Sequence, residues 1–177
     1  TKILVLRINI LKLVSPSHTT FVVGRRGTDN FIVAQELLYT LEKKKGKTGY
    51  MNIKIDLEKA YYRMEWSFVR NVLCSLGFQN ATVELILSCI SSTFVSLLFN
   101  GEQLEEFEPS RGLQKGDLIS PYIFILCMEL LSALINKKCK DGDWDKVKAS
   151  RNGLGFSHMF FANDLLLFAK ANLENYE

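Results

Sequence analysis

The chain has 177 residues, a hydrophobic fraction of 47% and a formal net charge of +3, which are ordinary values for one globular domain with a buried core. Charged residues interrupt its apolar stretches, as Lys2, Arg7 and Lys12 do near the start, which excludes a membrane span and a secretory signal. The four cysteines form no CxxC pair, so we interpret them as small buried residues of a reducing compartment. We therefore expect an intracellular protein, nuclear or cytoplasmic.

The first third of the chain predicts two helices and one strand. Residues 2–14 read as a helix that ends at Ser15-Pro16, and Thr28 is a candidate N-cap for a second helix that ends at Gly46. Apolar and polar residues then alternate over residues 51–57. This period of two predicts a half-buried strand, with Asp56 on its polar side.

The rest of the chain predicts three helices and two hairpins. The helices cover residues 66–76, residues 80–91, and a long segment from Ser120-Pro121, with Ser120 as N-cap, to about residue 138. The hairpins pair residues 95–99 with 103–107 and residues 158–161 with 165–168, on either side of a polar stretch over residues 141–155. Helices mixed with hairpins, without strict alternation, predict an α+β fold.

Four blocks of the sequence carry the chemistry. Asp56 stands on a strand, and Asn163-Asp164 stand in the turn of the last hairpin, an arrangement that suits divalent metal ions and phosphoryl or nucleotidyl transfer. The blocks read F-V-V-G-R over residues 21–25, K-I-D-L-E-K-A-Y-Y-R-M-E-W over residues 54–66, R-G-L-Q-K-G-D-L-I-S-P over residues 111–121 and F-A-N-D over residues 161–164.

In this order the blocks resemble the reverse transcriptases of LINE-type (non-LTR) retrotransposons. That family reads approximately F-V-P-G-R, K-x-D-x-x-K-A-Y-D-R-x-E-W, R-G-x-R-Q-G-D-P-L-S-P and F-A-D-D. The resemblance implies an RNA-directed DNA polymerase that extends a DNA primer on an RNA template with deoxynucleoside triphosphates and two Mg²⁺ ions. It also implies a right-hand polymerase fold, fingers-like over residues 1–50 and palm-like over residues 51–177 with residues 95–107 as an inserted hairpin.

The resemblance also assigns roles to single residues. Asp56 and Asp164 would be the metal ligands, and Tyr61 would pack under the sugar and exclude a ribose 2′-hydroxyl. Arg25 and Lys115 would contact the incoming nucleotide or the template. Gly116 would let the backbone approach the nascent base pair, and the same glycine can equally belong to an ordinary loop before a helix.

Position 163 departs from the family pattern, because it is Asn where the family has the first of two acids. An amide oxygen can coordinate Mg²⁺ but brings no charge to offset two dications. We expect the second ion to bind poorly and catalysis to be impaired. Asp164 is not expected to substitute, because adjacent residues of a strand point in different directions. We also expect a fragment, without the thumb and endonuclease of the family's polyprotein.

Two other interpretations stay open. One is a non-catalytic remnant that binds nucleic acid through Arg25, Arg26, Arg111 and Lys115. The other is an inert translated fragment. Two further basic clusters, residues 43–45 and 137–140, follow predicted helices, where lysine simply complements the helix dipole.

Overall fold

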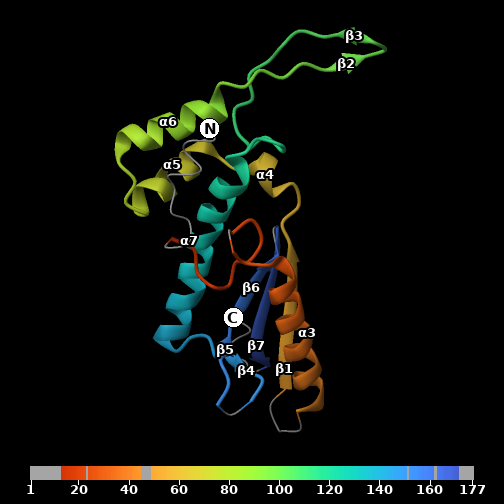
Figure 1. Ribbon diagram of the computed structural model, residues 1–177, viewed down its shortest axis with the longest axis vertical. Coiled ribbons are helices and arrows are strands. Elements are labelled where there is room, and N and C mark those ends of the chain that lie inside the picture. The colour runs from red at the N-terminus through yellow and green to blue at the C-terminus, as the bar shows by residue number, and fades with distance from the viewer. Residues whose placement is uncertain (1–12, 23, 45–48, 151, 162, 172–177) are drawn as a thin grey trace. The chain divides into compact units, whose positions relative to one another are not determined.

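The computed structural model describes residues 13–22, 24–44, 49–150, 152–161 and 163–171 (Figure 1). The helix predicted over residues 2–14 lies outside the described residues except at its end. The described chain forms two compact units, one of residues 59–127 and one of residues 13–58 with 128–171. Both combine helices with antiparallel strands, as the predicted α+β class requires. None of the helices described is long and apolar enough to cross a membrane. The fingers-like and palm-like division at residue 50 stays a prediction.

A three-stranded antiparallel sheet forms the centre of the unit that contains residues 13–58 and 128–171. Its order is β1-β7-β6, with β1 over Gly49–Asp56, β7 over Asp164–Ala171 and β6 over His158–Phe161. The middle strand β7 pairs with β1 along its whole length, from Ala171 opposite Gly49 to Asp164 opposite Asp56. The predicted last hairpin is thus confirmed as β6–β7, and β7 is four residues longer than expected, one at its start and three at its end.

Helix α3 (Gly27–Lys43) lies along this sheet (Figure 1). Phe168 of β7 is completely buried, and it forms the core with residues of α3, of β6 and of a further hairpin: Ala34, Leu37, Val147 and Met159. That further hairpin pairs β4 (Val147–Lys148) with β5 (Gly155–Phe156). This hairpin replaces part of the expected polar stretch over residues 141–155, because a single buried valine between two lysines gives no periodic signal of a strand.

The predicted N-cap of α3, Thr28, is wrong by two residues. The helix begins at Gly27, Arg26 occupies the cap position, and no side chain caps this end. Asn30 in the first turn donates instead to the carbonyls of Ser17 and Phe160, at 2.9 and 3.4 Å. The tertiary contacts of Asn30 therefore fix the start of this helix, whereas the sequence predicted that Thr28 would fix it as an N-cap.

Strand β1 is exposed along most of its length, which corrects the expected half-buried strand. Ile53 and Ile55, on its predicted apolar side, are 41% and 36% exposed. β1 is the edge strand of the sheet, so one neighbouring strand covers it within the described residues.

The unit of residues 59–127 packs two helices against each other, α5 (Trp66–Ser75) and α6 (Asn80–Ser91). Their buried side chains include Val69, Val72 and Leu73 on α5 and Val83, Ile86, Leu87 and Ile90 on α6. Short helix α4 (Ala60–Arg63) precedes them. Gly77, with a φ of +82°, ends α5 as predicted, because a left-handed backbone favours glycine.

Long helix α7 (Ser120–Asp141) begins near the predicted position, but Ser120 is not its N-cap. The carbonyl of Ile119 accepts the first bonds of the helix, from the N–H groups of Tyr122 and Ile123, so Ile119 holds the cap position. Ser120 lies inside the helix, and its buried hydroxyl has no hydrogen-bond partner within the part of the chain described. Complete burial of Ile119 fixes the turn without a polar cap.

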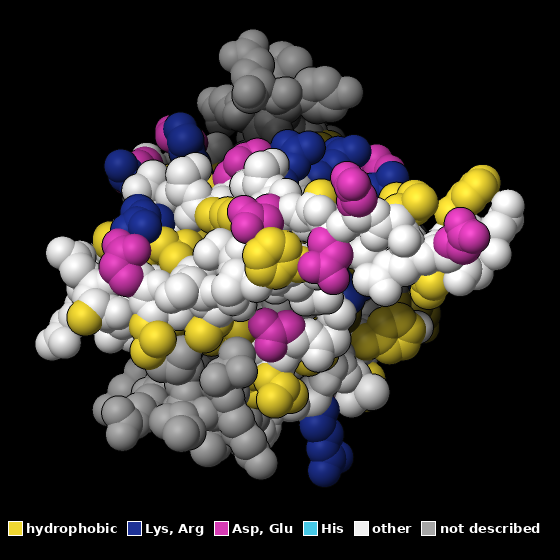
Figure 2. Space-filling view, turned by 90° about the horizontal axis from the view of Figure 1, so that it is seen from above, with side chains coloured by type: hydrophobic (Ala, Val, Ile, Leu, Met, Phe, Trp, Pro, Cys, Tyr) yellow, Lys and Arg dark blue, Asp and Glu magenta, His cyan; other side chains and the backbone are white. Residues whose placement is uncertain are grey.

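The hairpin over residues 95–107 carries exposed apolar side chains. Asn100 and Gly101, with φ values of +50° and +87°, form the turn between β2 (Leu98–Phe99) and β3 (Glu102–Gln103). One further bridge joins Val95 to Phe107, so the ladder is shorter than predicted. Figure 2 shows hydrophobic and acidic side chains on this projecting segment, where Leu98 is 79% exposed.

Replacing Phe168 by alanine should destabilise the fold strongly. The change removes the largest side chain from the core of the sheet and leaves a cavity, for an expected cost of about 3–5 kcal/mol. Urea unfolding monitored by circular dichroism gives this cost. The matched control is Leu154→Ala, at a leucine that is 79% exposed, which should change the free energy of unfolding little. Equal effects of the two substitutions would contradict the assigned core.

Candidate active site

Two carboxylates face each other across the sheet where β1 ends and β7 begins. Asp56 and Asp164 are direct partners in the antiparallel register. Side chains of directly opposed residues lie on the same face of a sheet, with Cβ atoms about 5 Å apart. Asp164 therefore lies on the same face of the sheet as Asp56. The sequence alone predicts that Asp164 points in a different direction from the metal-ligand position. The sequence could not show the shared face, because the two-residue turn sets which residue of the hairpin opposes Asp56.

Each of these carboxylates has a partner of its own. The Nδ2 amide of Asn163 donates to Oδ1 of Asp56 at 3.2 Å, and the backbone carbonyl of Asn163 accepts from the N–H of Leu57 at 3.3 Å. The ammonium of Lys54 pairs with Oδ2 of Asp164 at 3.3 Å. The period of two places Lys54 on the same side of β1 as Asp56, but the sequence alone gives no sign that Lys54 pairs with Asp164.

The ligand set suits a hard divalent cation. Two carboxylates and an amide oxygen are the donors that Mg²⁺ accepts. Asp56 is exposed and Asp164 is half-buried, so both can reach solvent. Among the described residues no group of three or more Asp, Glu, His or Cys side chains gathers at one point. The residues present therefore fit one cation, provided that Lys54 yields Asp164 and the Asn163 amide turns its oxygen toward the ion.

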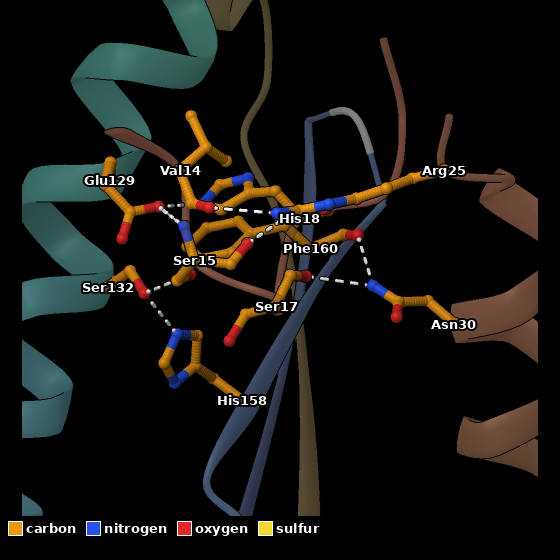
Figure 3. Close-up of polar contacts among 10 residues, drawn as sticks. All are labelled: Val14, Ser15, Ser17, His18, Arg25, Asn30, Glu129, Ser132, His158 and Phe160. Carbon is orange, nitrogen blue, oxygen red and sulfur yellow. Dashed lines mark hydrogen bonds and ion pairs between the residues drawn. The ribbon is translucent and has the colours of Figure 1, made fainter. Parts of the chain in front are cut away.

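Arg25 holds the segment that precedes α3 (Figure 3). Its guanidinium donates to the carbonyls of Ser15, His18 and Val14 at 2.5, 2.7 and 3.0 Å. Five fixed donors on a planar group suit this convergence of carbonyls. The nucleotide contact expected of Arg25 stays a prediction, and neighbouring Arg26 is exposed.

The same segment also packs a buried histidine, His18, against strand β6. The His18 ring stacks on Phe160, with ring centroids 4.1 Å apart and planes at 7°. On its other side, Nε2 of His18 lies 3.4 Å from Oε2 of Glu129 on α7, which also accepts the backbone N–H of Ser15 at 3.0 Å. Packing from α7 and from residues 14–18 therefore fixes β6 (Figure 3). Strand β6 leads directly into the turn that contains Asn163.

A second histidine, His158, is bonded at both ring nitrogens. Its Nε2 lies 2.8 Å from Oγ of Ser132 on α7, and its Nδ1 lies 3.0 Å from Oγ of Ser157. Ser132 in turn meets the hydroxyl of Ser15 at 3.2 Å. The residue types alone give no sign of such a network, because the two histidines are isolated in sequence.

Burial controls the charge of these groups. Desolvation, with the fields of His158 and Arg25, lowers the pKa of His18 to about 3. Desolvation, with the field of Lys146, lowers the pKa of His158 to about 4. Desolvation also raises the pKa of the Glu129 carboxyl above its ordinary value, against the hydrogen bonds from Ser15. Both imidazoles are therefore neutral near pH 7.

Acid should weaken the fold through these imidazoles, which belong to the only two histidines of the chain. Their folded-state pKa values lie below the ordinary 6.5, so the unfolded chain binds more protons as the pH falls. The free energy of unfolding should be highest above pH 6.5 and decrease as the pH falls from about 6.5 to about 3, with Glu129 partly offsetting the loss at the acid end. Urea unfolding across this range measures it. His158→Gln should show a shallower decrease, and an identical pH dependence would contradict the assignment.

In the unit of residues 59–127, a glycine fixes the loop before α7. The N–H of Gly112 donates to the carbonyl of Met64 at 2.8 Å, and its carbonyl accepts Nε1 of Trp66 at 2.8 Å. Gly112 has a φ of +100°, and a Cβ there would lie 2.9 Å from the carbonyl oxygen of Tyr62. Gly112 therefore allows a close backbone approach within the chain itself, and the approach of Gly116 to a nascent base pair stays a prediction. Gly116 also has a positive φ, of +97°, but a Cβ there would meet no described atom within 4 Å.

The nucleotide-binding candidates of this unit are Tyr61 on α4 and Lys115 and Gly116 in the loop before α7. Tyr61 is half-buried and stacks on Phe124 with ring centroids 4.4 Å apart, and burial raises the pKa of its phenol. Lys115 lies over the ring of Tyr62, 5.5 Å from its centroid. Lys115 and Gly116 also border a pocket of about 620 Å³, whose other lining residues are Cys89, Ser92, Thr93, Gln114 and Asp117.

Alanine substitution should separate the two glycines. Gly116→Ala should cost about 1–2 kcal/mol, because alanine disfavours a positive φ. Gly112→Ala should cost more, since it adds a collision with the Tyr62 backbone to the same conformational penalty. Urea unfolding of both variants measures the difference. Equal losses would show that the loop relaxes around Gly112.

Comparison with known sequences identifies the family. The reverse transcriptase (RNA-dependent DNA polymerase) family profile matches residues 1–175. The chain belongs to this family. It is 22% identical over 148 residues to the retrovirus-related Pol polyprotein of the type-1 retrotransposable element R2 from Popillia japonica. It is 26% identical over 119 residues to that of the type-2 element R2DM from Drosophila melanogaster. The resemblance to LINE-type reverse transcriptases is therefore confirmed.

These alignments cover 84% and 67% of the chain, but only 23% and 10% of the two polyproteins. An uncharacterized mitochondrial protein of Arabidopsis thaliana is 38% identical over 71 residues, which are 40% of the chain and 58% of that protein. The chain thus spans less than two thirds of the curated relatives it matches.

Solved structures show the same fold. Apo telomerase from Candida tropicalis, truncated from its C-terminal domain, aligns with 99% of the chain and 34% of its own at a TM-score of 0.59 and 15% identity. Telomerase from the same organism, in complex with the TWJ fragment of telomeric RNA, aligns with 95% of the chain and 28% of its own at a TM-score of 0.60 and 14% identity. The predicted right-hand polymerase fold is therefore confirmed.

Proposed function

We propose that this chain carries the nucleotidyl-transfer site of an RNA-directed DNA polymerase, in a form weakened by Asn163. The observation that supports it is the direct opposition of Asp56 and Asp164 at one end of the sheet. Membership of the reverse transcriptase family supplies the reaction: a primer 3′-hydroxyl attacks the α-phosphorus of a deoxynucleoside triphosphate, and pyrophosphate leaves. The substrates would be an RNA template, a DNA primer and deoxynucleoside triphosphates.

Asp56 and Asp164 would hold the divalent cation, and the amide oxygen of Asn163 would be a neutral third ligand. When bound, a Mg²⁺ ion activates the primer hydroxyl and offsets the charge of the triphosphate. Lys54 pairs with Asp164 at 3.3 Å and holds its carboxylate in place in the absence of the ion. Tyr61, Arg25, Lys115 and Gly116 keep the nucleotide-binding roles that the resemblance gives them.

Asn163 lowers activity in two ways under this proposal. It brings no negative charge to the ligand set, so one cation rather than two is well held. Its amide also donates to Asp56 at 3.2 Å, and this hydrogen bond occupies an oxygen that the cation needs. An aspartate at position 163 would reverse both effects, since a carboxylate accepts and does not donate.

Primer extension tests the proposal. The chain and its Asn163→Asp variant are each grafted into a complete reverse transcriptase of the family, and Mg²⁺- and Mn²⁺-dependent extension is measured on an RNA template. We expect the variant to extend faster by roughly 10²-fold or more, the scale of one electrostatic partner in an active site. Asp164→Asn in the same graft is the control, and it should abolish the extension that remains.

Equal extension by the chain and its Asn163→Asp variant would show that position 163 does not limit activity. No extension by either graft, with RNA binding retained, would favour a non-catalytic nucleic-acid-binding remnant. Failure of the grafts to give a cooperative unfolding transition would favour an inert fragment.

A further inference from the structure

A pocket rich in lysine lies at the end of the sheet opposite the two carboxylates. We propose that this lysine pocket binds the phosphate groups of a single-stranded nucleic acid. It has a volume of about 500 Å³ and is lined by Lys44, Tyr50, Lys146, Val147, Lys148, Ala149, Ser150 and Lys170. All of these residues belong to the same unit as Asp56 and Asp164.

The strand register separates the lysine pocket from the carboxylates. Tyr50 pairs with Lys170 near one end of the β1–β7 ladder, and Asp56 pairs with Asp164 at the other end. Six residues along a strand span roughly 20 Å. The lysine pocket is therefore a separate site and cannot share a ligand atom with the carboxylates.

Short-range contacts hold the lysines in place. Nζ of Lys44 donates to the carbonyl of Lys148 at 2.9 Å and lies 4.9 Å from the centroid of the Tyr50 ring. Lys146 and Lys148 flank Val147, which is 1% exposed, so the alternation of β4 turns both lysines to the opposite side.

Gly155 makes room for both lysine stems. It pairs with Lys148 across the β4–β5 ladder. A Cβ at Gly155 would lie 3.0 Å from Cβ of Lys146 and 3.7 Å from Cε of Lys148. The two aliphatic stems thus pack where a side chain would otherwise stand, and their ammonium groups extend beyond them.

The charge of the pocket exceeds what helix-end chemistry explains. Lys44 directly follows α3 and complements the helix dipole, but Lys146, Lys148 and Lys170 lie next to or on strands, which have no such dipole. Asp145 pairs with Lys170 at 2.9 Å and offsets one of the four positive charges. The pocket therefore presents a positive field, which favours an anionic ligand.

The chemistry of the pocket favours a chain of phosphates over a single one. Compact phosphate sites use forked arginines or converging backbone N–H groups, whereas these lysines act as point charges contributed by three separate segments. Such an arrangement follows a flexible polyanion.

Titration of the full chain with a fluorescent single-stranded oligouridine RNA, across a range of salt concentrations, tests the proposal. The variant is Lys146→Glu with Lys148→Glu, and the matched control is Lys137→Glu with Lys140→Glu, at exposed residues of α7 with the same change of net charge. We expect the pocket variant to bind more weakly and to lose roughly 1.4 from the slope of log K against log salt, at 0.7 for each of two contacts. The control should keep nearly the full slope.

A second variant, Gly155→Ala, changes no charge. It should weaken RNA binding by displacing the two lysine stems, while circular dichroism checks that the fold persists. Equal weakening by the control pair would show a diffuse charge effect and overturn the site. Three competitors test the choice of ligand: polyglutamate, phosphatidylserine vesicles, and inorganic phosphate at the same phosphate concentration as the RNA. If any of them displaces the labelled RNA as effectively as unlabelled RNA does, the choice of ligand is overturned.

This proposal does not depend on the proposed polymerase function. Binding is measured without divalent ions, primer or nucleotides, and none of the substituted residues contacts Asp56, Asn163 or Asp164 in the described structure. Inactive grafts, with oligouridine binding intact, would refute only the proposed polymerase function. Active grafts, with oligouridine binding unchanged in the pocket variant, would refute only the proposed role of the lysine pocket.

Discussion

Strand β7 pairs with a neighbour on each of its edges, and this double pairing sets the position of every group discussed above in its unit. One register brings Asp164 opposite Asp56, sends Phe168 into the core under α3, and places Lys170 beside Tyr50. A slip of one residue would turn each of these side chains to the other face of the sheet. The carboxylates, the core and the lysine pocket therefore form together or not at all, because one hydrogen-bond ladder aligns all three.

Segments that obey a simple periodicity could be predicted from the sequence. α5, α6 and the last hairpin lie where the residue pattern placed them, because glycine or turn residues bound each of them. Predictions failed where tertiary contacts decide how exposed a residue is or which residue caps a helix. Ile53 and Ile55 alternate as in a half-buried strand, yet they are exposed because β1 is at an edge. Ser120 resembles a cap, yet buried Ile119 holds that position.

The candidate site was predictable in its residues but not in its contacts. The motifs identify Asp56, Asn163 and Asp164, whereas the Lys54 ion pair and the Asn163 hydrogen bond need the register of the hairpin. Tyr62, which stands where the family pattern has Asp, and Lys115, which stands where it has Gln, also meet in space, as a lysine over an aromatic ring. Such a pair contributes about 0.5–1 kcal/mol at an exposed site. Substitutions that seem unrelated in sequence can thus support each other.

The exposed edge of β1 has a consequence for solubility. Within the described residues β1 pairs on one side only, so its outer side presents N–H and C=O groups beside two exposed isoleucines. An edge of this kind is a template on which a strand of another molecule can add. The charge of Lys54, midway between Ile53 and Ile55, opposes such stacking of like strands, because each added copy would bring its own lysine alongside. The residue that neutralises Asp164 is thus also a gatekeeper against aggregation.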